Sequence, residues 1–80
     1  MNIKDGKTVI IGLNSSNVHS LEYNHETKEL IATLKTGKYS YKNVDKQVFL
    51  LIEAAYINQD SVGREFNRLI VKGGYEYEKL

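Results

Sequence analysis

The sequence KELIATLKTGKYSYKNV, residues 28–44, decides the fold class because it predicts a β-hairpin. In residues 28–35 apolar and polar side chains alternate, apart from Ile31, as they do in a strand with one buried face. The apolar positions of this strand are Leu30, Ala32 and Leu34. Thr36-Gly37 predicts a tight turn in which the glycine can supply a positive φ. Residues 38–44 are therefore expected to return as the next strand.

Two further strands are predicted before the hairpin. Residues 7–13 (KTVIIGL) contain a β-branched run, and residues 17–24 alternate in the manner of a strand. The side chains predicted on one side of the second strand are His19, Leu21 and Tyr23. The polar residues of 14–17 and 24–27 form the connecting loops, because such side chains readily bond their own backbone.

Helical patterns begin directly after the hairpin. Asp45 is suited to N-cap a first helix, and Val44 and Phe49 can pack across this cap as a hydrophobic staple. A broad apolar stripe then continues through Tyr56. This helix is expected to lie across the sheet and cover the core.

A second helix is predicted to begin at Asp60 or Ser61 and to end at Gly73-Gly74. Its apolar face consists of Val62, Phe66, Leu69 and Ile70, and its basic stripe of Arg64, Arg68 and Lys72. Residues 75–80 alternate and are expected to add an extended segment. The sequence thus predicts one α+β domain over residues 1–80, a small antiparallel sheet of three to four strands followed by two helices packed on one face.

Composition bounds the function. The chain has 80 residues, no cysteine and a net charge of +1, so it can form no disulfide and lacks the strong positive charge of a non-specific nucleic-acid binder. Residues 28–72, however, contain eight Lys and Arg but only five Asp and Glu. The polar N-terminus has no signal-peptide pattern, and we expect a cytoplasmic protein without a membrane contact. A homodimer is expected, because association would stabilise so small a domain.

Four short motifs resemble those of the KTSC domain, a small bacterial and phage domain also found at the C-terminus of some lysyl-tRNA synthetases. They are Ser15-Ser16-Asn17, Tyr39-Ser40-Tyr41, Ser61-x-Gly63-x-x-Phe66-Asn67-x-x-Ile70 and Tyr75-x-Tyr77. The likeness covers residues 15–80 and leaves residues 1–14 as an N-terminal extension, expected to be a strand. Glu65 stands where the family often has an aromatic residue, and no proline follows the central Tyr-x-Tyr. The resemblance implies a stand-alone KTSC domain, for which RNA binding is the usual suggestion.

Tyr39 and Tyr41 are candidate base-stacking residues, and the register of the hairpin decides their role. A two-residue turn at Thr36-Gly37 places Tyr39 opposite Leu34. It also places Tyr41 opposite Ala32, so that both rings enter the core. A three-residue loop turns both rings to the other face. There they form an exposed aromatic surface with lysines nearby, and bases could stack on the two rings. Thr-Gly favours the short turn and core tyrosines.

The start of the second helix is the candidate phosphate site. Its free N–H groups and partial positive charge favour an anion, Gly63 lets a ligand approach, and Arg64 can bind the same phosphate. The full candidate set is Ser61, Gly63, Arg64, Arg68 and Lys72. An ordinary N-cap with solvated surface arginines is the alternative, and it is favoured. Asn67 is predicted to be a half-buried residue bonded to a neighbouring loop.

Catalysis and metal binding have little support in the sequence. His19 and His25 lack metal-ligand spacing, and no hydrolase or nucleotide-hydrolysing motif is present. We therefore expect no enzyme, no cofactor and no metal. Two hypotheses remain, a binding module for RNA or a phosphate-bearing nucleotide, and a protein-interaction module that docks through a sheet edge or the tyrosine-rich tail.

Overall fold

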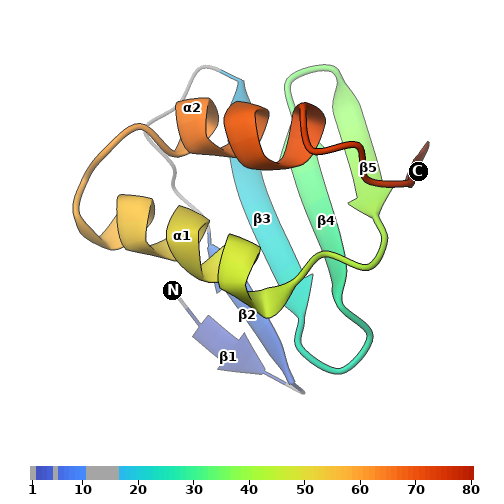
Figure 1. Cartoon of the computed structure of the whole chain (residues 1–80), viewed down its shortest axis with the longest axis horizontal. Coiled ribbons are helices and arrows are strands. Elements are labelled where there is room, and N and C mark those ends of the chain that lie inside the picture. Colours follow the sequence, from blue (N-terminus) through green and yellow to red (C-terminus); the bar gives the residue numbers. More distant parts are fainter. Residues whose placement is uncertain (1, 5, 11–16) are drawn as a thin grey trace.

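Helices cover one face of a single antiparallel sheet in the computed structural model, which describes residues 2–4, 6–10 and 17–80 (Figure 1). The strands are β1 (Asn2–Lys4), β2 (Lys7–Ile10), β3 (Val18–Asn24), β4 (Glu29–Leu34), β5 (Gly37–Tyr41) and β6 (Tyr77–Lys79). Each strand pairs with the next one along the chain, so their order in the sheet is their order in the sequence. The helices are α1 (Lys46–Ile57), α2 (Val62–Phe66) and the π-helical η1 (Asn67–Val71). This arrangement confirms the predicted α+β class with an antiparallel sheet.

The sheet has more strands than the predicted three to four. Among the described residues, β1 pairs with β2 at one edge, and β6 from the C-terminal tail pairs with β5 at the other. The strand predicted over residues 7–13 is confirmed as β2 over its first four residues. The rest of that prediction, the polar loop before Asn17 and the Ser15-Ser16 pair lie outside the described residues.

The hairpin turn lies one residue earlier than predicted. Leu34 is opposite Gly37, so the turn consists of Lys35 and Thr36. Tyr39 pairs with Ala32 and Tyr41 with Leu30, which moves each tyrosine two residues along β4 relative to the prediction. A shift of two keeps the same face, because strand side chains repeat every second residue. The tyrosines therefore face the helices, as the short-turn alternative predicts.

A stacked aromatic pair joins the sheet to α1. The rings of Tyr23 on β3 and Phe49 on α1 have centroids 4.6 Å apart and planes inclined by 11°, and both side chains are fully buried. The Tyr23 hydroxyl donates a 2.6 Å hydrogen bond to the carbonyl of Val44. Burial, with a smaller contribution from Asp45, raises the pKa of this hydroxyl. Asp45 occupies the N-cap position, but its side chain makes no capping hydrogen bond, contrary to the predicted cap.

The second helical segment begins at Ser61, whose Oγ accepts a 3.2 Å hydrogen bond from the backbone N–H of Arg64. It changes from α-helix to π-helix at Asn67, where the carbonyl accepts a 3.0 Å bond from the N–H of Lys72. Its buried side chains are Val62, Phe66 and Ile70, spaced four residues apart. Gly74, with φ of +76°, reverses the chain, as predicted for the glycine pair.

A polar network on the open face of the sheet connects its last three strands. The fully buried hydroxyl of Ser40 donates to the Glu29 carboxylate, and Lys42 Nζ lies 3.0 Å from the same carboxylate oxygen. Lys42 also lies 3.6 Å from Glu78 of β6. The hydrogen bonds from Ser40 and then Lys42 lower the pKa of the Glu29 carboxyl, and the Glu29 contacts raise the pKa of Lys42.

Glu29→Gln should reduce the loss of stability in acid. Because the pKa of Glu29 is lower in the folded state than in the unfolded chain, its contribution is complete above the unfolded pKa and is lost as the pH falls through the folded pKa. In thermal unfolding measured from about pH 6 to about pH 3, the melting temperature of the wild type should fall toward that of the variant. Ser40→Ala should reduce the loss of stability between these two pH values in the same way, because it removes one of the hydrogen bonds to the Glu29 carboxylate. If the melting temperatures of the wild type and Glu29→Gln changed with pH in parallel, Glu29 would not have this role.

Candidate functional site

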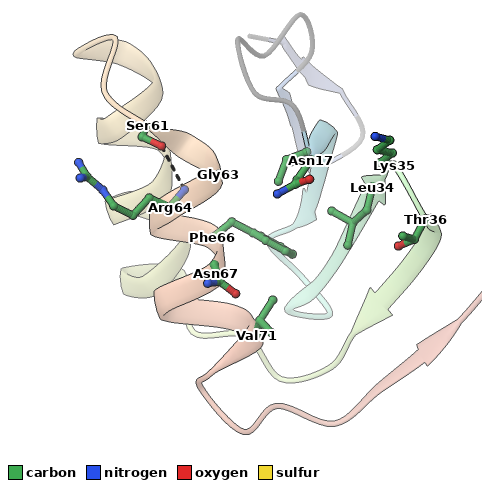
Figure 2. A pocket seen from close by; sticks show the side chains of 11 residues that line it. Asn17, Leu34, Lys35, Thr36, Ser61, Gly63, Arg64, Phe66, Asn67 and Val71 are labelled. Carbon is green, nitrogen blue, oxygen red and sulfur yellow. Dashed lines mark hydrogen bonds between the residues drawn. The ribbon is translucent and has the colours of Figure 1, made fainter.

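A groove of 670 Å³ separates the second helical segment from the ends of β3 and β4 (Figure 2). One wall is formed by the strand ends and the hairpin turn, and the other by α2 and η1. The lining residues are Asn17, Val18, Leu34, Lys35 and Thr36 on the first wall, and Ser61, Gly63, Arg64, Phe66, Asn67 and Val71 on the second. Residues far apart in sequence thus form a single concave surface.

A β-bulge and a backbone hydrogen bond position the strand wall. The register shifts between Val18 and Ser20, so Val18 pairs with Leu34 and both lie on the helix-facing side. Beyond this pair, the carbonyl of Asn17 accepts a 2.9 Å hydrogen bond from the N–H of Lys35. Asn17 and Lys35 are therefore held side by side at the end of the sheet. The same bulge leaves His19 exposed, so it does not share the buried face of Leu21.

The floor of the groove is apolar. Phe66 is only 2% exposed, and its ring points from the helix toward Leu34 (Figure 2). Val18 is buried, Leu34 is half-buried, and Val71 leaves 52% of its surface exposed at one end of the groove. An apolar floor with a few polar groups around it is the usual composition of a small-molecule site.

Polar side chains line the rim on both walls. The Asn17 amide points toward the helix, and Asn67 lies across the groove from the strand wall (Figure 2). Asn67 is exposed and lines the groove, so the predicted half-buried residue bonded to a loop is a wrong assignment. Asn67 still continues the regular helix, since its N–H bonds to the carbonyl of Gly63, and the π-helical turn widens the helix only after it.

The charge of the lining is positive. Lys35 and Arg64 are exposed, and no carboxylate occurs among the described residues that line the groove. The Arg64 guanidinium points away from the strand wall, so only the backbone of Arg64 borders the groove directly (Figure 2). The groove can therefore accept an anion beside Lys35, and Arg64 can reach it only after a change of rotamer.

The structure separates the five candidate phosphate ligands into two groups. Ser61, Gly63 and Arg64 line the groove, whereas Arg68 and Lys72 do not. Arg68 instead forms an ion pair with Glu65, three residues earlier, at 2.5 Å. The even spacing of Arg64, Arg68 and Lys72 had suggested one continuous basic stripe. The groove, however, borders only the cation in the first turn of α2, Arg64.

Tyr41 cannot serve as a base-stacking platform, which corrects that assignment. It is 6% exposed, and its ring packs 5.8 Å from that of Phe66 and 5.4 Å from that of Tyr77. Burial, and then the nearby Tyr77 and Tyr39, raises the pKa of its hydroxyl. Because a helix covers the ring, no base can stack on it.

Tyr39 lies at the margin of the core, half-buried. Its hydroxyl is 3.3 Å from Oγ1 of Thr36, which lines the groove. Lys79 Nζ lies 5.9 Å from the centre of the ring, within the range of a cation–π contact. Base stacking by Tyr39 therefore stays a prediction, for a position beside the groove rather than within it.

Sequence reasoning did not select Asn17, Lys35 or Thr36 as site residues. Two signals were available for them. Asn17 closes the first of the motifs that resemble the KTSC domain, and Lys35 precedes the predicted turn. Neither signal shows that the turn of one hairpin lies across from the start of a helix near residue 61, because this proximity depends on packing.

The histidines lie outside the groove. Nε2 of His25 is 2.6 Å from Oγ1 of Thr8. The rings of His25 and Tyr23 lie nearly perpendicular, with their centroids 5.0 Å apart. His19 is exposed on β3. Across residues 2–4, 6–10 and 17–80, no group of three or more metal-ligating side chains is placed to hold an ion. In the same part of the chain, no helix is long and apolar enough to cross a bilayer.

The fold and the groove define a class, a small α+β domain that has helices on one face of an antiparallel meander and a groove between the second helical segment and the hairpin turn. No protein-family model matches the sequence. No curated protein matches it either.

The chain has a KTSC-like fold, which confirms the predicted one. It is similar to the crystal structure of a KTSC domain protein from Yersinia pestis, with a TM-score of 0.72. The two sequences are 23% identical, and the match covers 92% of this chain and 97% of the other.

Proposed function

We propose that this protein is a non-enzymatic binding module for RNA or a phosphate-bearing nucleotide, which occupies the groove between the second helical segment and the hairpin turn. The observation that carries the proposal is the composition of the lining among the described residues, an apolar floor with Lys35 on one wall, Arg64 within reach after a change of rotamer, and no carboxylate. Such a site attracts an anionic ligand that has a flat apolar part. Nucleotides have both properties.

The base would lie over the floor formed by Phe66 and Leu34. The amides of Asn17 and Asn67, on opposite walls, are placed to meet the polar edge of a base, since an amide offers both a donor and an acceptor. The phosphate would lie toward Lys35. The exposed Arg64 side chain would turn from its present direction to contact the same phosphate, a charge-assisted contact that arginine often makes.

The size and charge of the site favour a short ligand. A groove of 670 Å³ lies within the range of about 300–1,000 Å³ for small-molecule sites, and accommodates a nucleotide or a short segment of single-stranded RNA. Two phosphate-contacting cations predict a shallow salt dependence, with a slope of log K on log salt of about −1.4 for a single strand. The net charge of +1 agrees with such a ligand better than with a long duplex.

Binding rather than catalysis is also supported by the positions of the titratable groups. Neither His19 nor His25 lines the groove, and its lining contains no carboxylate. The lining therefore offers no general base of the usual kind. The hydroxyl of Ser61 already accepts a hydrogen bond from the N–H of Arg64 as a helix cap.

Lys35→Ala and Arg64→Ala should each weaken binding by about tenfold, the effect of losing one charge-assisted hydrogen bond. The measurement is fluorescence-anisotropy titration with a labelled single-stranded RNA of about eight nucleotides, with mononucleotides as competitors, at two salt concentrations. Each variant should also reduce the salt slope by about 0.7. Lys72→Ala is the matched control, because this exposed lysine lies outside the groove.

Two results would contradict the proposal. One is absence of binding for every RNA and nucleotide at low salt. The other is binding that Lys35→Ala and Arg64→Ala leave unchanged. Either result would favour the alternative, a protein-interaction module without a nucleic-acid ligand.

A further inference from the structure

Helix α1 is apolar on two opposite faces. Its inner face buries Phe49, Ile52 and Ala55 against the sheet. Its outer face, which consists of Leu50, Leu51, Ala54 and Ile57, is exposed to solvent. The exposed fractions are 38% for Leu50, 54% for Leu51 and 59% for Ile57. Apart from Lys46, Gln47 and Glu53, α1 is apolar on both sides, and an apolar helix face is normally buried, so the outer face lacks a covering partner among the described residues.

The outer face has the spacing of a helix–helix contact. Leu50, Ala54 and Ile57 follow the i, i+4, i+7 pattern and form a single line along α1. The line contains a large residue followed by a small one. When two such lines run antiparallel about a centre near residue 52, Leu50 of each helix lies against Ala54 of the other. This large-on-small pairing lets two copies of the same surface interdigitate.

Charges at the two ends of α1 favour the same arrangement. Lys46 stands in the first turn, and Asp60 lies just beyond the last, where its N–H bonds to the carbonyl of Ala55 at 2.8 Å. Each charge has the sign that the dipole of its own helix disfavours at that end. In an antiparallel pair centred near residue 52, Lys46 of one helix lies opposite Asn58 of the other, two residues before Asp60 and within reach of it for a long lysine side chain, and the two dipoles oppose each other. Neither residue has an ion-pair partner among the described residues.

We propose that a second copy of this chain covers the outer face of α1, in a two-fold symmetric, antiparallel α1–α1 dimer. A two-fold contact requires a surface that is complementary to itself, and this face meets that requirement in both shape and charge. The 12 residues of α1 extend over only about 18 Å, so the contact is small and the dimer is weak, with a dissociation constant on the order of 100 µM. No groove-lining residue lies on α1, so the dimer is independent of the proposed ligand.

Sedimentation velocity of the full chain from about 1 µM to about 500 µM tests this dimer over the range expected for a small interface. The wild type should shift from monomer to dimer as its concentration rises. Leu50→Glu should raise the dissociation constant at least about tenfold, because it places a charge at the centre of the contact. Leu80→Glu is the matched control, since Leu80 is also exposed, at 60%, but lies outside α1. Circular dichroism should show that all variants remain folded.

A charge exchange tests the orientation. Lys46→Glu and Asp60→Lys should each weaken the dimer, and the double variant should restore it, because only an antiparallel pair brings these two positions together. A chain that stays monomeric over the whole range would overturn the proposal and assign the face to a different protein. A dimer that survives Leu50→Glu, or a double variant weaker than both single variants, would also overturn it.

Discussion

Phe49→Ala should lower the free energy of unfolding by about 3–5 kcal/mol, the usual cost of removing a buried aromatic ring. Phe49 is fully buried, and its ring stacks on that of Tyr23 at 4.6 Å. The variant loses this stacking and leaves a cavity between α1 and β3. A domain of 80 residues has a total stability of roughly 4–12 kcal/mol, so the loss would be at least about a quarter of the total.

Urea denaturation followed by circular dichroism measures this loss. Leu51→Ala is the control on the same helix, because Leu51 is 54% exposed. At about 1 µM protein, where the proposed weak dimer is dissociated, this control should change the stability by less than about 0.5 kcal/mol. A loss for Phe49→Ala no larger than that of Leu51→Ala would show that the ring does not pack as described.

Gly73→Ala should cost about 2–3 kcal/mol, in the range of an overpacked site. A Cβ at this position would lie 2.3 Å from the carbonyl oxygen of Leu69 and 2.9 Å from the ring of Tyr75. The carbonyl belongs to the last turn of η1, so the contact can be relieved only if that turn opens. The Tyr75 side chain would also move, and with it the approach of the chain to β6.

Gly74→Ala is the matched comparison, because the adjacent glycine is required for a different reason. A Cβ at Gly74 meets no atom within 4 Å, but its φ of +76° disfavours any residue with a Cβ. This strain costs about 1 kcal/mol. Thermal and urea denaturation should therefore rank Gly73→Ala as the less stable variant. Equal losses would mean that conformational strain, rather than lack of space, governs both positions.

The locally encoded features of the fold could be read from the sequence. The alternation over residues 29–34 predicted β4, Ser61 was one of two predicted caps of the second helix, and the glycine pair predicted its end. Each of these depends on residues within a few positions of one another. The side chain of Asp45 shows the limit, since a residue suited to capping makes no capping bond here.

The sequence correctly predicted that Tyr39 and Tyr41 lie on the helix-facing side of the hairpin, but not which residues they pair with. The turn lies at Lys35-Thr36, one residue before the predicted Thr36-Gly37. This shift brings Lys35 to the end of the sheet beside Asn17 and so into the groove. Turn chemistry alone did not distinguish two positions that leave the same face buried, because both satisfy the apolar alternation.

The candidate site could be predicted only in part. Ser61, Gly63 and Arg64 were selected from the sequence, whereas Arg68 pairs with Glu65 and Lys72 lies elsewhere. Helical periodicity places residues on a face, but the strands packed against that face determine which turn borders a groove.

The sequence by itself therefore determined the class of fold, the order of its hairpin and helices, the apolar face of the second helix and the glycine stop before the tail. These features depend on side-chain periodicity and on hydrogen bonds between near neighbours. Only the tertiary structure decided that Tyr41 is core, that the tail adds β6, and that Asn17 and Lys35 face the helix start across an apolar floor. Such contacts join residues 25 or more positions apart, and no local pattern encodes them, because they form when the sheet and the helices bury their apolar faces against one another.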